Sequence, residues 1–143
     1  MAAFDGSYRH KIDAKGRLSL PADYRRELKQ DLKLVLSPDK DHPSIWVFDP
    51  DEFTEWLNGY FEKRGGFDPS NRKMANWRKV MSARAAKCQL DDNGRIRLTA
   101  EQRERACLGS EVMIIGDVDH LEIWDADRWA AFEEEFMSSD WDD

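Results

Sequence analysis

The chain has 143 residues and carries 22 basic against 29 acidic side chains, which gives a net charge of -7. Its hydrophobic content of 41% and its six tryptophans are typical of a folded globular protein and exclude a wholly disordered one. No window approaches the run of about 18 uncharged apolar residues that a membrane span requires. No apolar signal core follows the start MAAFDGSYRH, so we expect a cytoplasmic protein without a membrane partner.

The negative charge is concentrated near the C-terminus. The last 35 residues hold one basic and 12 acidic side chains, whereas the residues before Gly109 carry a net charge of +4. A basic region can bind nucleic acid even when the whole chain is acidic. The acidic tail is either a solvated surface that keeps the protein soluble or a segment that competes with DNA for the basic surface.

An internal repeat covers most of the chain. A shift of 78 residues aligns residues 12–46 with residues 90–124, with eleven identities in 35 positions. After a two-residue slip, Asp49–Phe53 matches Asp125–Trp129, so we interpret the repeat as a duplication. The identical pairs are Asp13/Asp91, Gly16/Gly94, Arg17/Arg95, Leu20/Leu98, Ala22/Ala100, Arg25/Arg103, Asp39/Asp117, Asp41/Asp119, His42/His120, Ile45/Ile123 and Trp46/Trp124.

The first copy begins with a predicted hairpin. Residues 8–12 and 17–20 alternate between apolar and polar side chains, as a half-buried strand does. The intervening Asp13–Gly16 ends in a glycine that can take the left-handed conformation of a tight turn. Pro21 then predicts the start of a short helix, and two strands follow at 33–37 and 44–48.

Helices follow this first group of strands. A helix that opens at residues 49–51 carries aromatic side chains at helical spacing, and a break at 65–69 separates it from an amphipathic helix that contains residues 74–81. The second copy then repeats the order of the first. Its predicted elements are strands around 88–90 and 96–98 on either side of the turn 91–94, a helix opened by Thr99, strands at 111–115 and 121–124, and a helix that carries Trp129, Phe132 and Phe136.

Basic side chains lie on one face of each predicted hairpin. They are Arg9, Lys11, Lys15 and Arg17 in the first copy, and Lys87, Arg95 and Arg97 in the second. A two-stranded ribbon can enter the DNA major groove, where arginine bonds guanine and lysine holds phosphate. Alternatively, Asp13/Arg17 and Asp91/Arg95 are structural ion pairs and the other bases are ordinary exposed edge charges; the charge pattern leaves both interpretations open.

At these residues the chain resembles the MraZ family, bacterial regulators encoded at the head of the division and cell wall gene cluster. The resemblance rests on Asp13-Ala-Lys-Gly-Arg17 and Asp91-Asp-Asn-Gly-Arg95, together with Phe4-x-Gly6, Pro21-Ala-x-x-Arg25 and the two Ile-Trp strands. It covers nearly the whole chain. It implies an α+β, mainly β, fold of two tandem swapped-hairpin modules of the SpoVT-AbrB type, which form a pseudo-twofold barrel with amphipathic helices packed around it.

The same resemblance implies function and organisation. It implies sequence-specific binding to direct repeats in the protein's own promoter, a homo-oligomeric ring, and location in the cytoplasm and nucleoid. The expected organisation is a first SpoVT-AbrB module at 7–54, a helical connector at 55–82, a second module at 83–126, and a C-terminal helix with an acidic tail at 127–143.

Arg17 and Arg95 carry over as DNA contacts, and Asp13 and Asp91 as the residues that orient them. The second turn has Asn93 in place of Lys15 and Asp92 in place of Ala14, so we expect the first hairpin to dominate DNA contact. The full set of DNA-contact candidates is Arg17, Arg95, Lys15, Arg9, Lys11 and Arg97, with Asp13, Gly16, Asp91 and Gly94 as the residues that shape the turns.

Other site types find less support in the sequence. His42 and His120, each flanked by aspartates, could bind a divalent cation, but their place between strands favours turn formation, and we expect neither a metal nor a cofactor. Cys88 and Cys107 have no CxxC partner and are interpreted as buried thiols. Because a nucleophile motif and a phosphate loop are lacking, we expect neither an enzyme nor a small-molecule substrate. The alternative function is an oligomeric protein-interaction module with only non-specific DNA affinity.

Overall fold

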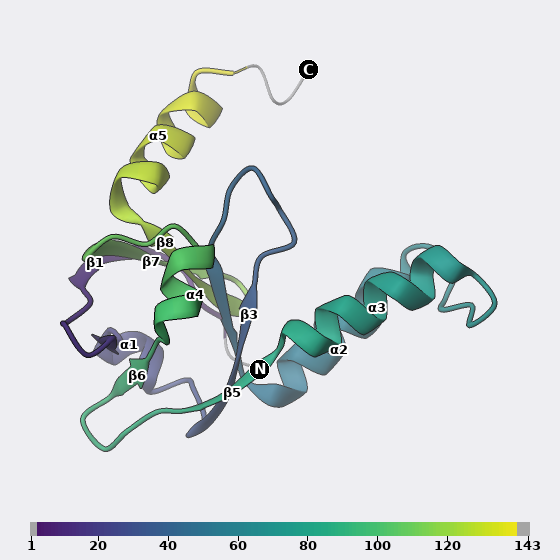
Figure 1. The fold of residues 1–143 in the computed structure, drawn as a ribbon, viewed down its shortest axis with the longest axis horizontal. Coiled ribbons are helices and arrows are strands. Elements are labelled where there is room, and N and C mark those ends of the chain that lie inside the picture. The colour runs from purple at the N-terminus through teal and green to yellow at the C-terminus, as the bar shows by residue number, and fades with distance from the viewer. Residues whose placement is uncertain (1–2, 140–143) are drawn as a thin grey trace.

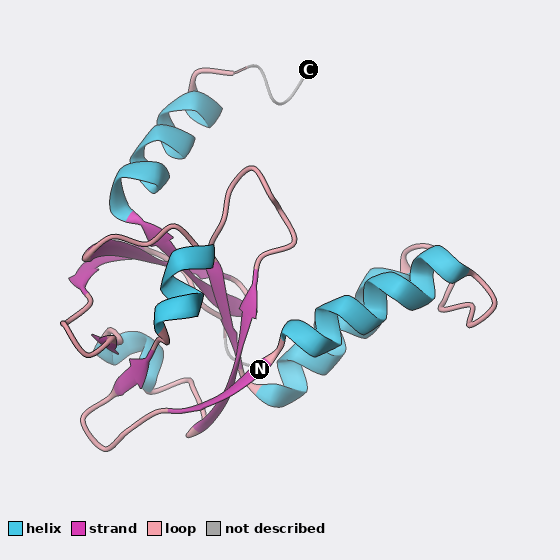
Figure 2. Cartoon of the chain, in the orientation of Figure 1, coloured by secondary structure: helices cyan, strands magenta, loops and turns pink. Residues whose placement is uncertain are grey.

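The computed structural model describes residues 3–139, and in this part of the chain it is an α+β fold of two sheets and five helices (Figures 1 and 2). A six-stranded antiparallel sheet has the order β1-β7-β8-β4-β3-β5, and β2 and β6 form a separate two-stranded sheet. The strands are β1 (Ser7–Lys11), β2 (Arg17–Ser19), β3 (Asp31–Leu36), β4 (Ile45–Phe48), β5 (Ala86–Gln89), β6 (Arg95–Arg97), β7 (Glu111–Asp117) and β8 (His120–Asp125). The helices are α1 (Ala22–Arg25), α2 (Pro50–Glu62), α3 (Arg72–Arg84), α4 (Ala100–Arg105) and α5 (Ala126–Met137).

The helix starts follow from local chemistry. The hydroxyl of Thr99 accepts a hydrogen bond from the backbone N–H of Gln102 at 3.0 Å, and the Gln102 side chain accepts one from the N–H of Thr99 at 2.8 Å. This reciprocal pair is a capping box, which satisfies two N–H groups that the helix itself cannot bond. Pro21 precedes α1 and Pro50 is the first residue of α2, where a missing N–H costs nothing. Within residues 3–139, none of the helices combines the length and the apolar character that crossing a bilayer requires.

The strands exchange partners between the two copies of the repeat. β1 pairs with β7, β5 pairs with β3, and β2 pairs with β6, all antiparallel. The predicted turns are present, but the prediction that each turn joins two strands paired with each other is wrong. The alternation of apolar and polar residues determines which face of a strand is apolar, but it does not determine which strand pairs with it. Here each strand beside a turn forms its hydrogen-bonded ladder with a strand of the other copy.

Hydrogen bonds repeated in both copies give the true alignment of the duplication. The N–H of Ile12 donates to the carbonyl of Ser110, and in the other copy the N–H of Leu90 donates to the carbonyl of Gln30. The two donors, residues 12 and 90, are 78 positions apart, whereas the two acceptors, residues 30 and 110, are 80 positions apart. The Asp49 and Asp125 carboxylates accept from the N–H groups of residues 29 and 109 respectively, which sets an offset of 76 for β4 and β8. The single offset of 78 through residue 46 is therefore wrong beyond the short helix.

This corrected alignment separates the two predicted turn histidines. His42 lies in the loop that joins β3 to β4, whereas His120 is the first residue of β8 and is buried. The turn prediction is confirmed for His42 and wrong for His120. The loop between β3 and β4 is longer than the turn between β7 and β8, which displaces the matching Asp-His sequences relative to the strands.

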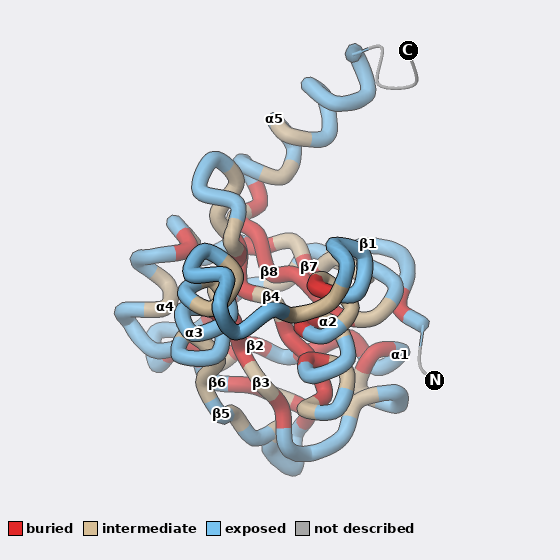
Figure 3. Tube along the Cα trace, turned by 90° about the vertical axis from the view of Figure 1, so that its right-hand side faces the viewer, coloured by how far each residue is buried: buried red, intermediate tan, exposed pale blue. Residues whose placement is uncertain are grey.

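Two groups of buried apolar side chains hold the fold together. Figure 3 shows that the buried residues concentrate in the strands. The larger one lies between the sheets and includes Leu18 and Ile96, which face each other across β2 and β6. Each such side chain contributes about 1.5–3 kcal/mol through burial. The smaller group joins α2 and α3 to the large sheet, and the Trp77 ring stacks on Tyr60 at a centroid distance of 3.8 Å. α2 and α3 lie side by side and project from the sheet, and α5 projects separately (Figure 1).

Candidate nucleic-acid interface

The first turn holds Arg17 through Asp13. One oxygen of the Asp13 carboxylate accepts hydrogen bonds from the backbone N–H groups of Lys15 and Arg17, each at 2.9 Å. The other oxygen accepts from Nε of Arg17 at 2.7 Å. The backbone N–H of Arg17, aided by its side chain and the N–H of Lys15, holds the pKa of Asp13 below its ordinary value. Asp13 is therefore an anion at neutral pH and fixes the direction of the guanidinium.

The second turn reproduces this geometry around Arg95. Asp91 accepts from the N–H groups of Asn93 and Arg95 at 2.9 Å and from Nε of Arg95 at 3.1 Å. The N–H of Arg95 is again the main cause that lowers the pKa of Asp91. Within residues 3–139, the terminal amino groups of Arg17 and Arg95 have no hydrogen-bond partner. The structural ion pairs of the alternative interpretation are thus present, and each leaves the end of its arginine available to a ligand.

The pairing of β2 with β6 brings the two turns together. Leu18 lies opposite Ile96 and both are buried, so the next residue on either side faces outward. Arg17 lies directly opposite Arg97, and Arg95 lies opposite Ser19. The carbonyl of each turn glycine accepts a hydrogen bond from the other copy, through the N–H groups of Leu20 and Leu98. We call this outward face of Arg17, Ser19, Arg95 and Arg97 the arginine ribbon.

The remaining predicted residues lie elsewhere. Arg9 and Lys11 belong to β1 in the large sheet, where Arg9 forms an ion pair with Glu111 at 3.4 Å. The side chain of His10, between them, turns toward β2 and its ring bonds the carbonyl of Ser19 at 2.6 Å. Arg9 and Lys11 therefore face away from β2. Lys15 is exposed at the first turn, beside the arginine ribbon.

Two further arginines lie against the turns, and sequence reasoning did not select them. Arg25 bonds the carbonyl of Asn93 at 3.3 Å, and its Nε atom is buried without a hydrogen-bond partner. Arg103, its counterpart, lies 3.6 Å from the position that a Cβ atom on Gly16 would occupy. Each arginine thus belongs to one copy and packs on the turn of the other. The one sequence feature that could have identified them is that Arg25 and Arg103 are identical in the repeat alignment.

The structure also places the cysteines and the acidic tail. Cys88 is half-buried, and burial raises the pKa of its thiol, but Cys107 is exposed, so the prediction of two buried thiols is wrong for Cys107. The glutamates of α5, Glu133–Glu135, are exposed on the projecting helix. Asp140, Asp142 and Asp143, which complete the predicted acidic tail, lie outside the described residues.

Known proteins are similar to this chain over almost its full length. The family described as "MraZ protein, putative antitoxin-like" matches residues 3–75 and 81–143. The chain belongs to the MraZ family. A protein of Corynebacterium urealyticum named "Transcriptional regulator MraZ" is 38% identical over 141 residues, which cover 96% of this chain and 94% of the relative. Proteins of the same name from Corynebacterium diphtheriae and Limosilactobacillus fermentum are 39% and 35% identical, over 92% and 97% of this chain and 87% and 92% of theirs. The MraZ resemblance in the sequence is therefore confirmed.

Proposed function

We propose that this MraZ-family chain is a DNA-binding transcriptional regulator that recognises direct repeats in its own promoter, at the head of the division and cell wall gene cluster. The names of its relatives support regulation of transcription. The arginine ribbon is the observation that carries the proposal for this chain, with Arg17 and Arg95 as base-reading residues and Lys15 as a phosphate contact.

The arrangement of the arginine ribbon argues for an anionic ligand. Like charges directly opposite each other on two strands destabilise a sheet, yet Arg17 faces Arg97 across β2 and β6. An acceptor-rich ligand between them would turn this repulsion into binding energy. Guanine offers two acceptors in the major groove that match the fork of an arginine, and a two-stranded ribbon is narrow enough to reach them.

The exchanged strand pairing supports the finer fold proposal. The two copies act as swapped-hairpin modules of the SpoVT-AbrB type, related by a pseudo-twofold axis that passes between Leu18 and Ile96. Arg9 and Lys11, which lie on the large sheet, contact the DNA phosphate backbone farther from the arginine ribbon. Assembly of several chains into a ring would present several arginine ribbons to neighbouring DNA repeats and raise their effective concentration. This activity places the protein on the nucleoid, in the cytoplasm.

Fluorescence anisotropy tests this function. The protein is titrated onto a duplex that carries the direct repeats upstream of its own gene and onto a scrambled duplex, each at two salt concentrations. We expect tighter binding to the repeats, with an affinity that falls as salt rises, because phosphate contacts release counterions. Arg17→Ala should cost about 1–3 kcal/mol per engaged site and relax specificity there.

The matched control is Arg64→Ala. Arg64 follows the C-terminal end of α2, where its guanidinium donates to the Tyr60 carbonyl. α2 projects away from the two sheets (Figure 1), so loss of Arg64 removes the same charge far from the arginine ribbon. We expect this variant to retain specific binding and Arg95→Ala to lose less affinity than Arg17→Ala. Equal losses from Arg17→Ala and Arg64→Ala would contradict the proposal. Equal, weak binding to both duplexes would favour the protein-interaction module instead.

A further inference from the structure

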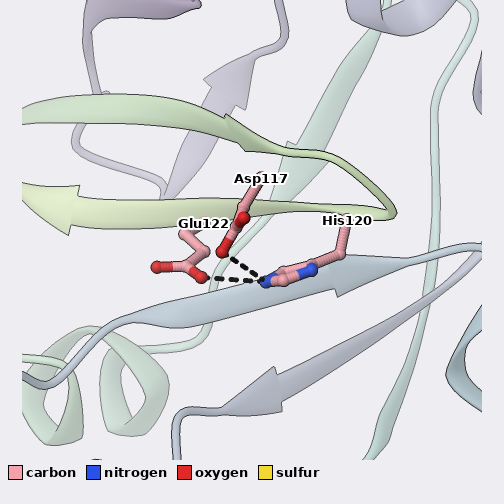
Figure 4. Close-up of side chains that lie close together, drawn as sticks. All are labelled: Asp117, His120 and Glu122. Atoms are coloured by element: carbon pink, nitrogen blue, oxygen red, sulfur yellow. Dashed lines mark hydrogen bonds and ion pairs between the residues drawn. The ribbon is translucent and has the colours of Figure 1, made fainter. Parts of the chain in front are cut away.

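A buried histidine lies between carboxylates where β7 meets β8 (Figure 4). His120 is 4% exposed, and its Nε2 atom lies 2.9 Å from Oε2 of Glu122 and 3.8 Å from Oδ2 of Asp117. The potential ligand atoms of the three residues all lie within 4.8 Å of one another, and this is the one such group among residues 3–139. The proposed DNA contacts do not involve these residues.

Neighbouring groups orient both buried side chains toward a common point. Nδ1 of His120 donates to a carboxylate oxygen of Asp119 at 2.7 Å, and Nε2 donates to Oε2 of Glu122 at 2.9 Å. An ion bound at Nε2 takes the place of the proton between His120 and Glu122, while Asp119 keeps the proton on Nδ1 and the ring in place. The indole of Trp124 donates to Oε1 of Glu122 at 2.8 Å, so Oε2 is the oxygen that faces the histidine. A carboxylate behind a histidine and a donor behind a carboxylate are the partners that surround metal ligands in proteins.

Packing also fixes the plane of the imidazole. The His120 ring packs against both Phe48, stacked at a centroid distance of 4.9 Å, and Trp46, at 4.5 Å. The ring therefore cannot turn its Nε2 atom away from Asp117 and Glu122 without disturbing the smaller apolar group. This rigidity lowers the conformational cost of binding an ion there.

The spacing fits a small divalent ion. Nitrogen and oxygen ligands lie about 2.0–2.2 Å from Zn²⁺, so two ligand atoms at a tetrahedral angle are about 3.4 Å apart. The observed separations of 2.9 and 3.8 Å lie on either side of that value. Three carboxylates, those of Asp117, Asp119 and Glu122, surround a single imidazole, so a dication also offsets the excess negative charge.

We propose that Asp117, His120 and Glu122 bind a first-row divalent transition-metal ion of the Zn²⁺ type. Such ions accept an imidazole nitrogen together with carboxylate oxygens, whereas Mg²⁺ prefers oxygen ligands alone. The Asp117 side chain is 55% exposed, so the ion enters from the surface and its remaining coordination positions face solvent. The site is independent of DNA binding.

The first copy provides a matched comparison. Asp39, Asp41 and His42 repeat the residue types and spacing of Asp117, Asp119 and His120. His42 lies in a loop, with its Nδ1 atom 3.0 Å from Asp39 and its ring against Phe132, and it has no counterpart of Glu122. The same short sequence therefore forms a ligand group in one copy and a turn in the other.

Isothermal titration calorimetry with Zn²⁺ on the full chain tests the site. The experiment uses a Cys107→Ser background, because the exposed thiol could itself bind zinc. We expect one Zn²⁺ per chain with micromolar or tighter affinity, no saturable binding of Mg²⁺, and Co²⁺ absorption bands typical of a nitrogen and oxygen site. Asp117→Asn and His120→Gln should each weaken Zn²⁺ binding at least tenfold, whereas His42→Gln should leave it unchanged.

Asp117→Asn keeps the test valid if the buried His120→Gln variant fails to fold, because the Asp117 side chain is exposed. Circular dichroism can verify that the Asp117→Asn variant is folded. Absence of 1:1 binding to the background protein would overturn the proposal. Zn²⁺ affinity that is unchanged in Asp117→Asn, or that falls equally in His42→Gln, would overturn it as well.

Discussion

Replacing Gly16 with alanine should destabilise the protein because of the backbone at the first turn. Gly16 has a φ of 83°, in the left-handed region that costs an L-residue roughly 1–2 kcal/mol. An added Cβ would also collide with the backbone oxygen of Leu98, and the strand must shift to relieve the contact. That shift weakens the hydrogen bond from the N–H of Leu98 to the carbonyl of Gly16, which contributes about 0.5–1.5 kcal/mol. Gly16→Ala should therefore lower the free energy of unfolding by about 2–3 kcal/mol.

Gly59→Ala is the matched control and should change stability in the opposite direction. Gly59 lies inside α2, its φ is not positive, and an added Cβ would meet no atom within 4 Å. A glycine inside a helix costs roughly 0.5–1 kcal/mol relative to alanine, so this variant should be stabilised by that amount.

Urea unfolding of both variants at equal chain concentration measures the two effects. A Gly16→Ala protein as stable as the wild type would refute the argument from φ and the Leu98 contact. So would a Gly59→Ala protein destabilised to the same extent as Gly16→Ala, since the effect would then arise from losing any glycine.

Three further measurements test particular contacts. Burial raises the pKa of Tyr24 to about 12, so ultraviolet titration should show a tyrosine that ionises near pH 12 and that Tyr24→Phe removes. The stability this group contributes should be present below pH 10 and lost as the pH rises to about 12. Nuclear magnetic resonance should show that the Asp13 carboxyl titrates below its ordinary pKa. The stability that this group contributes is present above its pKa in the unfolded chain and is lost as the pH falls through its lowered pKa in the folded protein. Arg17→Ala should keep part of that lowering, because the backbone N–H of residue 17 is the largest single cause and remains in the variant. A return to the ordinary pKa would disprove this. Trp77→Ala removes the stacking on Tyr60 and should cost about 3 kcal/mol, the lower end of the range for tryptophan because Trp77 is only partly buried. Hydrogen exchange should then accelerate in α2 and α3 before the sheets, and uniform acceleration would contradict a separate helical unit.

Local features of this protein could be read from its sequence. The duplication, the two turns and the pairing of each Asp with the Arg four residues later all follow from residue types at short spacing. The structure shows the same turn hydrogen bonds at Asp13 and Asp91. These features are local because one carboxylate and a few neighbouring N–H groups are sufficient to form them.

The tertiary structure decided which strands pair and at what offset. Alternation places Arg17 outward whichever partner β2 has, but only pairing with β6 sets it opposite Arg97. Likewise, the identical Asp-x-Asp-His sequences could not reveal that one histidine begins a buried strand and the other lies in a loop. Strand partners and loop-dependent offsets arise from contacts between residues far apart in the chain, and the short-range pattern of a single sequence does not encode that choice.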